Sequence, residues 1–277
     1  MGTSKSMPTP AGGQWTDLKA ELSSYLAGDD EVTPQQLVKT TLAAVGGLPI
    51  RSPGSGAGGA SGVGGGGRGG GTGGGGGGGG GSRTSVGQAV SGLGGFGRAL
   101  AEGGLGQALT ALGMGDLEGK SATEVIARIS EHLSEDCNGL EQDVLRGALQ
   151  QAILNAAELM DDPSYENLEN SLQDFVSREG AEGLLELFLT QYVFDRVWLM
   201  IEDYASRRTD SQQQMGNLEA AVEQSCRANV RDELAFHKEQ GTFSNLDWFG
   251  NDGLRVADDL VSDLEQRLTA NTQGGGE

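Results

Sequence analysis

Apolar residues recur every three or four positions along most of the chain, the spacing of an amphipathic helix. Alternation with a period of two, which marks a β-strand, is not sustained anywhere. The pattern therefore predicts an all-α protein with a multi-helix, bundle-like domain over residues 84–270. The helices expected in this domain cover residues 86–100, 105–112, 125–133, 140–160, 165–175, 184–204, 215–234 and 254–268.

The helix over residues 184–204 differs from its neighbours because it is apolar on most of its faces. Such a helix is typical of the centre of a bundle, where other helices cover it. Before it, Asp162 and Pro163 predict the start of the helix over 165–175, and Gly180 predicts its end.

Residues 1–50 form an N-terminal arm with two short helical patterns. The first contains Trp15 and Leu18 and stops at Gly28, and the second begins with Thr33 and Pro34 in a capping box and stops at Gly46. Two short helices bury too little surface to fold alone, so we expect them to dock on the main body or on a partner.

Residues 51–83 have the composition of a flexible linker, with 21 glycines between Gly54 and Gly81. A Gly-rich coil of about thirty residues has an end-to-end distance on the order of 30 Å. We therefore expect the N-terminal arm to be tethered but free to reach a partner. Residues 271–277 are a polar tail.

Glycine is also frequent in the helix over 86–100, which contains Gly87, Gly92, Gly94, Gly95 and Gly97. Each glycine lowers helix propensity by about 1 kcal/mol relative to alanine. We expect close packing against another helix to compensate for this loss.

The charge balance argues against a phosphate-binding surface. The 277 residues include 19 Lys and Arg and 39 Asp and Glu, and residues 101–277 carry 12 basic and 34 acidic side chains. This disfavours binding to nucleic acid or to an anionic membrane. We interpret the acidic surface as a solvated one rather than as a docking face for a basic partner. No apolar leader or membrane span is apparent, so we expect a soluble cytoplasmic protein.

The sequence GMGDLEGKS at residues 113–121 is close to a phosphate-binding loop, but Met114 occupies the position of the first glycine. The preceding segment is helical rather than a strand. We interpret Ser121 instead as the N-cap of the next helix, in a capping box with Glu124.

Histidine and cysteine are scarce. Neither His132 nor His237 has a Cys, an Asp or a second His three or four residues further on, so we expect histidines at the core boundary and no metal site. Cys226 lies in an apolar stripe, and we interpret it as a small buried hydrophobic residue. Cys137 lies just outside a helix end. Both are expected to be reduced thiols.

Neighbouring carboxylates do not form an acid and base pair, because adjacent residues on a helix diverge by about 100°. The three pairs, Asp161/Asp162, Glu202/Asp203 and Asp258/Asp259, are interpreted as caps and solvated faces. We expect a protein that is not an enzyme and needs no cofactor.

The first residues suggest a different kind of site. Removal of Met1 would expose the α-amino group of Gly2, which has a pKa of about 7.7 to 8 in an unhindered terminus. The same residues match an N-terminal acylation pattern. The alternative is an ordinary trimmed terminus without a role.

The order of features along the chain resembles the QatB family, the B component of the bacterial Qat anti-phage defence system. The features that carry the resemblance are Met1-Gly2-Thr3-Ser4, Trp15 with Leu18, the Gly-rich arm, the helix over 86–100, the turn over 112–121 and Tyr192-Val193-Phe194-Asp195-Arg196.

This resemblance implies an accessory protein that acts with an ATPase, a QueC-like (preQ0-synthase-like) enzyme and a TatD-like nuclease. It further implies that the QueC-like partner conjugates a 7-deazaguanine to Gly2, with Thr3, Ser4, Lys5 and Ser6 as the recognition sequence. The rival hypotheses are a helical adaptor or regulatory scaffold with an unmodified N-terminus, and an enzyme that uses His132 or His237.

Overall fold

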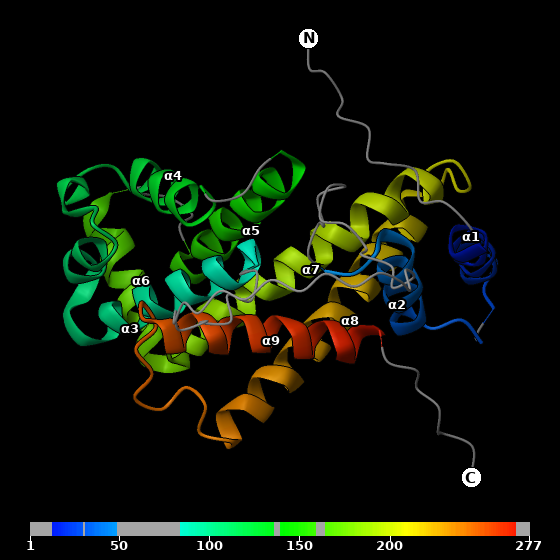
Figure 1. The fold of residues 1–277 in the computed structure, drawn as a ribbon. Coiled ribbons are helices and arrows are strands. Elements are labelled where there is room, and N and C mark those ends of the chain that lie inside the picture. Colours follow the sequence, from blue (N-terminus) through cyan, green and yellow to red (C-terminus); the bar gives the residue numbers. More distant parts are fainter. Residues whose placement is uncertain (1–12, 30, 49–83, 136–138, 159–163, 270–277) are drawn as a thin grey trace, which may run out of the picture.

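The computed structural model describes residues 13–29, 31–48, 84–135, 139–158 and 164–269. Within these ranges the chain forms nine α-helices, one short 3-10 helix and no strand, which confirms the predicted all-α fold (Figure 1). The elements are α1 Gly13–Leu26, α2 Pro34–Val45, α3 Ser85–Ala111, η1 Gly115–Leu117, α4 Ala122–Leu133, α5 Leu140–Ala157, α6 Tyr165–Glu179, α7 Ala181–Ala205, α8 Gln212–Glu239 and α9 Asn251–Thr269.

Helix α7 forms the centre of the molecule, as its apolar sequence predicts. Phe188, Tyr192 and Val197 of this helix are fully buried. Figure 1 shows α4 and α6 toward one end of the molecule and α1 and α2 toward the other, while α8 returns past α7 and α9 lies alongside α3. No described helix is both long and apolar enough to cross a bilayer.

Helix α3 packs closely against its neighbours through its glycines, which confirms the expectation from the sequence. A Cβ atom on Gly94 would lie 2.6 Å from the indole ring of Trp248, and one on Gly97 would lie 3.2 Å from the Cα of Ala181. The Ser91 hydroxyl also donates a hydrogen bond to the carbonyl of Trp248. The lost helix propensity is thus offset by contacts that a side chain would prevent.

The two helices predicted over 86–100 and 105–112 form the single helix α3, with a kink between them. Gly103 and Gly104 have non-helical backbone angles, and Gly104 has a φ of 80°. The backbone break lies where the two apolar stripes separate in the sequence.

The N-cap of α2 is confirmed, but its capping box is only half formed. The Thr33 hydroxyl accepts a hydrogen bond from the Gln36 amide at 3.2 Å. The Gln36 side chain donates instead to Glu21 on α1, at 2.8 Å. The residue expected to close the box therefore joins α1 to α2.

The predicted start of α6 needs correction. Its N-cap is Ser164, whose hydroxyl accepts from the Asn167 amide at 3.3 Å. Asp162 and Pro163 lie outside the described residues. Gly180 ends α6 as predicted, with a φ of 76°.

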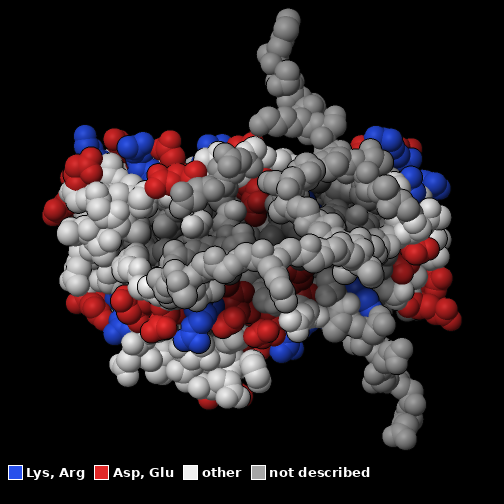
Figure 2. Space-filling model, viewed as in Figure 1, with Lys and Arg blue, Asp and Glu red and all other residues white. Residues whose placement is uncertain are grey.

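Acidic side chains are prominent over α9 on the face shown in Figure 2. Several of them have partners within the chain. Asp258 accepts hydrogen bonds from the backbone and the hydroxyl of Thr84, at 3.1 and 2.6 Å, and Asp252 pairs with Arg255 at 3.3 Å. Asp258 therefore attaches the start of α3 to α9. The paired carboxylates were predicted to be caps and solvated faces, so this contact between two helices was not predicted.

Candidate functional site

The five N-terminal residues singled out in the sequence, Gly2, Thr3, Ser4, Lys5 and Ser6, lie outside the described residues. So do the linker over 51–83, the tail over 271–277 and Cys137. The structure describes the chain from Gly13, and it therefore fixes the point from which the N-terminal residues extend.

The first two helices dock on the main body. The hydroxyls of Ser23 and Tyr204 lie 3.0 Å apart, which joins α1 to α7. The ammonium of Lys19 lies 5.0 Å from the ring centre of Trp15 and 5.9 Å from that of Tyr204, at cation–π distance. Since α1 and α2 are held on the body, the Gly-rich linker does not set how far Gly2 can reach, and the expectation of a freely moving arm is corrected.

Two residues of the α7 sequence motif bind the end of α2. Tyr192 is fully buried and donates a hydrogen bond from its hydroxyl to the carbonyl of Leu48, at 2.7 Å. Arg196, one turn further along α7, donates to the carbonyl of Val45 at 3.5 Å. A cation at the C-terminal end of a helix is favourable because it faces the negative end of the helix dipole. The motif therefore holds the N-terminal arm in place.

Burial shifts the pKa values of the two charged residues in this motif. Burial lowers the pKa of the Arg196 guanidinium, and the nearby Tyr192 and Glu141 oppose that shift. Burial raises the pKa of Asp195, although a hydrogen bond from the Gln191 amide at 2.7 Å partly opposes it. These shifts arise from the packing of α7 in the centre of the bundle.

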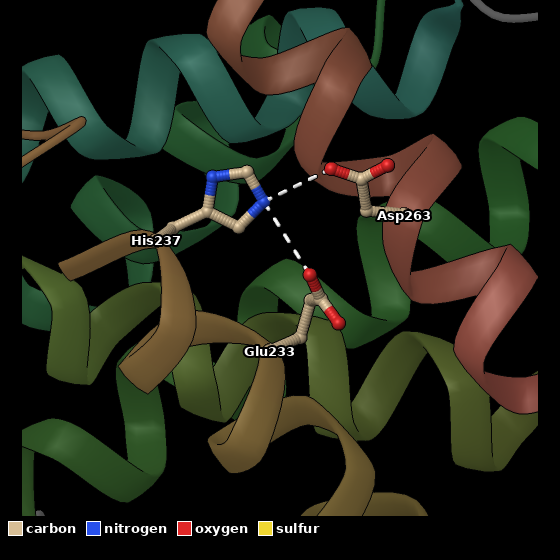
Figure 3. Close-up of side chains that lie close together, drawn as sticks. All are labelled: Glu233, His237 and Asp263. Carbon is tan, nitrogen blue, oxygen red and sulfur yellow. Dashed lines mark ion pairs between the residues drawn. The ribbon is translucent and has the colours of Figure 1, made fainter. Parts of the chain in front are cut away.

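A second group of charged side chains lies between α8 and α9 (Figure 3). The Nε2 atom of His237 is 3.5 Å from Oε1 of Glu233, one turn earlier on α8, and 3.3 Å from Oδ2 of Asp263 on α9. The side chains of His237 and Glu233 are 8% and 5% exposed, whereas that of Asp263 is 45% exposed. Arg267 on α9 pairs with the other carboxylate oxygen of Glu233.

This group corrects the prediction for His237, which is buried rather than at the core boundary. The prediction rested on the absence of Cys, Asp or His three or four residues after His237, whereas Glu233 lies four residues before it. Asp263 could be found only from the packing of α9 on α8. His132, by contrast, does lie at the boundary, with its side chain 39% exposed and its Nδ1 atom 3.5 Å from Glu135.

The other candidate residues have structural roles. Cys226 is fully buried, and burial raises the pKa of its thiol far above the ordinary value, which confirms the prediction of a small buried hydrophobe. Ser121 is the N-cap of α4 and accepts from the Glu124 amide at 3.3 Å, as predicted.

The fold and these contacts define an all-α protein whose N-terminal arm is held by a motif on its central helix. Residues 74–248 match the family model described as Qat anti-phage system associated protein QatB. The match covers more than half of the chain, and the chain therefore belongs to the QatB family. Comparison with curated proteins and with solved structures gives no match.

The family match confirms the resemblance inferred from the sequence. It covers α3, the turn over 112–121 and the α7 motif, whereas the Gly2 region lies outside it. The chain is thus a component of an anti-phage defence system, and other components of that system are its expected partners.

Proposed function

We propose that the protein is a non-catalytic accessory component that presents Gly2 to a QueC-like, preQ0-synthase-like partner. Gly2 serves as the recognition site or as the acceptor for conjugation of a 7-deazaguanine. Membership of the QatB family carries the proposal, and the sequence Met1-Gly2-Thr3-Ser4 supports it. The ATPase and the TatD-like nuclease of the same system are the further partners.

The chemistry of the terminus favours Gly2 over the nearby Lys5 as an acceptor. An α-amino group with a pKa of about 7.7 to 8 is partly unprotonated at neutral pH, whereas a lysine with a pKa of about 10.4 is almost entirely protonated. Only the unprotonated amine can attack an electrophilic carbon. Glycine also leaves that amine without a neighbouring side chain.

Because α1 is docked on the body, the segment that carries Gly2 extends from a fixed point. Gly2 lies eleven positions before Gly13, the first residue of α1, and a fully extended chain spans at most about 3.3 to 3.6 Å per residue. Gly2 can therefore reach at most about 40 Å from the start of α1. The reactive site of a partner that acts on Gly2 must therefore lie within that distance of the start of α1.

The intact mass of the protein, purified after co-expression with the other components of its system, tests the proposal. We expect an added mass corresponding to a 7-deazaguanine group, located on Gly2 by fragmentation of the N-terminal peptide. Co-expression without the QueC-like enzyme should leave Gly2 unmodified.

Two substitutions sharpen this test. Lys5→Arg removes the nearby side-chain amine and keeps its charge, so it should leave the modification in place. Gly2→Pro still permits removal of Met1 but replaces the primary amine with a hindered secondary one, so it should abolish the modification. A modification that disappears with Lys5→Arg and survives Gly2→Pro would overturn the assignment to Gly2.

The alternative function is that of a helical adaptor or regulatory scaffold with an unmodified N-terminus. The docking of α1 and α2 on the body is compatible with it, because their contacts do not require a free terminus. A complex that assembles and protects against phage with an unmodified Gly2, and equally well with Gly2→Pro, would favour the scaffold.

A further inference from the structure

The packing of α8 against α9 leaves one buried nitrogen without a hydrogen-bond partner. The Nε2 atom of His237 has no hydrogen bond, although the side chain is more than nine-tenths buried. It lies between the carboxylates of Glu233 and Asp263, at 3.5 and 3.3 Å. An N–H group that donated to one of the two carboxylates would point at it, since hydrogen bonds favour a near-linear angle. Here neither carboxylate accepts a hydrogen bond from the nitrogen, which faces both of them (Figure 3).

This arrangement has the dimensions of a metal site. Nitrogen and oxygen ligands bind zinc at about 2.0 to 2.2 Å, which places neighbouring ligand atoms of a tetrahedral site about 3.3 to 3.6 Å apart. Both distances from His237 fall in that range, and all three ligand atoms lie within 4.8 Å of one another. We propose that Glu233, His237 and Asp263 bind a divalent transition-metal ion of the zinc type.

The ligand types select the class of metal. One imidazole with two carboxylates suits zinc and its neighbours in the first transition row, whereas calcium and magnesium prefer oxygen ligands and six or more of them. Three protein ligands leave the fourth position of a tetrahedral site to water. Asp263 is half exposed, so both the ion and that water can enter from solvent.

Arg267 orients the ligand set. It pairs with Oε2 of Glu233 and leaves Oε1 directed at His237. Outer partners of this kind fix the orientation of a ligand and raise metal affinity. The two carboxylates and Arg267 together carry one negative charge, which a divalent cation changes to one positive charge.

The ion would tie α8 to α9 beside the loop that connects them. The ring of His237 stacks on Phe243 at 6.0 Å, and Phe243 stacks on Trp248 at 5.6 Å. Trp248 is the residue that packs on Gly94 of α3. A metal at His237 would therefore stabilise the aromatic loop on which the glycine face of α3 rests.

Zinc titration of the full-length protein, first stripped with a chelator and then dialysed, tests the proposal. Calorimetry should show one ion bound per chain, and cobalt should give the visible absorption of a tetrahedral complex. With zinc at about one hundred times its dissociation constant, the melting temperature should rise by about 5 to 10 °C.

Substitutions identify the residues that bind zinc. Asp263→Asn and His237→Gln should each weaken zinc binding by at least about 100-fold. His132→Gln is the matched control, because His132 also lies 3.5 Å from a glutamate but is half exposed and is not part of a described three-ligand group. It should bind zinc like the unsubstituted protein. If His237→Gln does not fold, Asp263→Asn carries the test, since this side chain is half exposed.

Two results would overturn the proposal: no zinc bound by the stripped protein, or binding that persists undiminished in Asp263→Asn. The three residues would then be an ion-pair network between α8 and α9 that holds no metal.

Discussion

Asp195 and Arg196 are neighbours on the central helix, and burial disfavours the charged form of both. For Asp195 this raises the pKa, and for Arg196 it lowers it. The arginine gains a compensating partner in the C-terminal carbonyls of α2. Among the described residues, Asp195 accepts a hydrogen bond only from Gln191 on its own helix, which is a weaker compensation.

We therefore predict that Asp195→Asn stabilises the protein at neutral pH. A carboxyl group whose pKa is higher in the folded than in the unfolded state binds its proton more tightly when folded, so it reduces stability as the pH rises through these two pKa values. Asparagine removes this loss of stability, and its side-chain oxygen can still accept the hydrogen bond from Gln191. The urea midpoint of the variant should exceed that of the unsubstituted protein at pH 7, and the difference should shrink as the pH falls and vanish below about 3, where Asp195 is protonated in both states.

Asp203→Asn provides a matched control on the same helix. Asp203 is well exposed and pairs with Arg207 at 2.6 Å, so its removal should change stability by less than about 1 kcal/mol. A loss of stability in Asp195→Asn at pH 7 would show that the carboxylate is favourable where it lies.

At the level of the element, α3 shows why a glycine-rich helix can be stable. Three of its glycines, Gly94, Gly95 and Gly97, lie against ring or backbone atoms of other elements, so their effect on stability depends on these contacts rather than on helix propensity. In an exposed helix, replacing glycine with alanine adds up to about 1 kcal/mol of stability. At Gly94 or Gly95 of α3 the added methyl group would have to displace an aromatic ring.

We predict opposite signs for two Gly→Ala substitutions. Gly94→Ala places a Cβ 2.6 Å from the ring of the buried Trp248, and we expect it to destabilise the protein by about 1 to 3 kcal/mol. Gly147→Ala, in the middle of α5, meets nothing within 4 Å, and we expect a gain of about 0.5 to 1 kcal/mol. Urea unfolding measures both, and a destabilising Gly147→Ala or a neutral Gly94→Ala would contradict the argument.

The elements could be predicted well from the sequence because a period of three to four residues and the capping residues are local signals. Thr33, Ser121 and Gly180 end or begin helices as predicted. Contacts between elements have no such signal. The partners of Gln36 and Asp258, and the approach of Asp263 to His237, depend on how the helices pack.

At the level of the whole molecule, the central question is how firmly α1 and α2 are held. Leu37 and Leu42 of α2 are fully buried against the body, and the buried hydroxyl of Tyr192 binds the carbonyl of Leu48 beyond the end of α2. These contacts join residues on opposite sides of the Gly-rich segment into one core. Helices α1 and α2 are thus part of the folded body, and the position of α1 constrains where residues before Gly13 can go.

We predict that Tyr192→Phe loosens this arm selectively. The substitution keeps the ring but leaves the carbonyl of the buried Leu48 without its donor, which costs about 1 to 3 kcal/mol. Hydrogen exchange followed by mass spectrometry should then show amides of α1 and α2 exchanging roughly 5 to 150 times faster, because about 1.4 kcal/mol is a tenfold change in an equilibrium constant. Amides in α5 should change much less, since the lost hydrogen bond joins α7 to the segment after α2 and not to α5.

Tyr25→Phe is the control, because it removes a hydroxyl from α1 for which the described residues provide no hydrogen bond. It should leave exchange in both α1 and α2 unchanged. An equal acceleration in α5 and α2 after Tyr192→Phe would show that the arm and the body unfold as one cooperative unit. If only α1 and α2 exchange faster, then the α7 motif is what keeps these two helices docked on the body. Loosening the motif would in that case extend the reach of Gly2, because the chain would be free up to the linker.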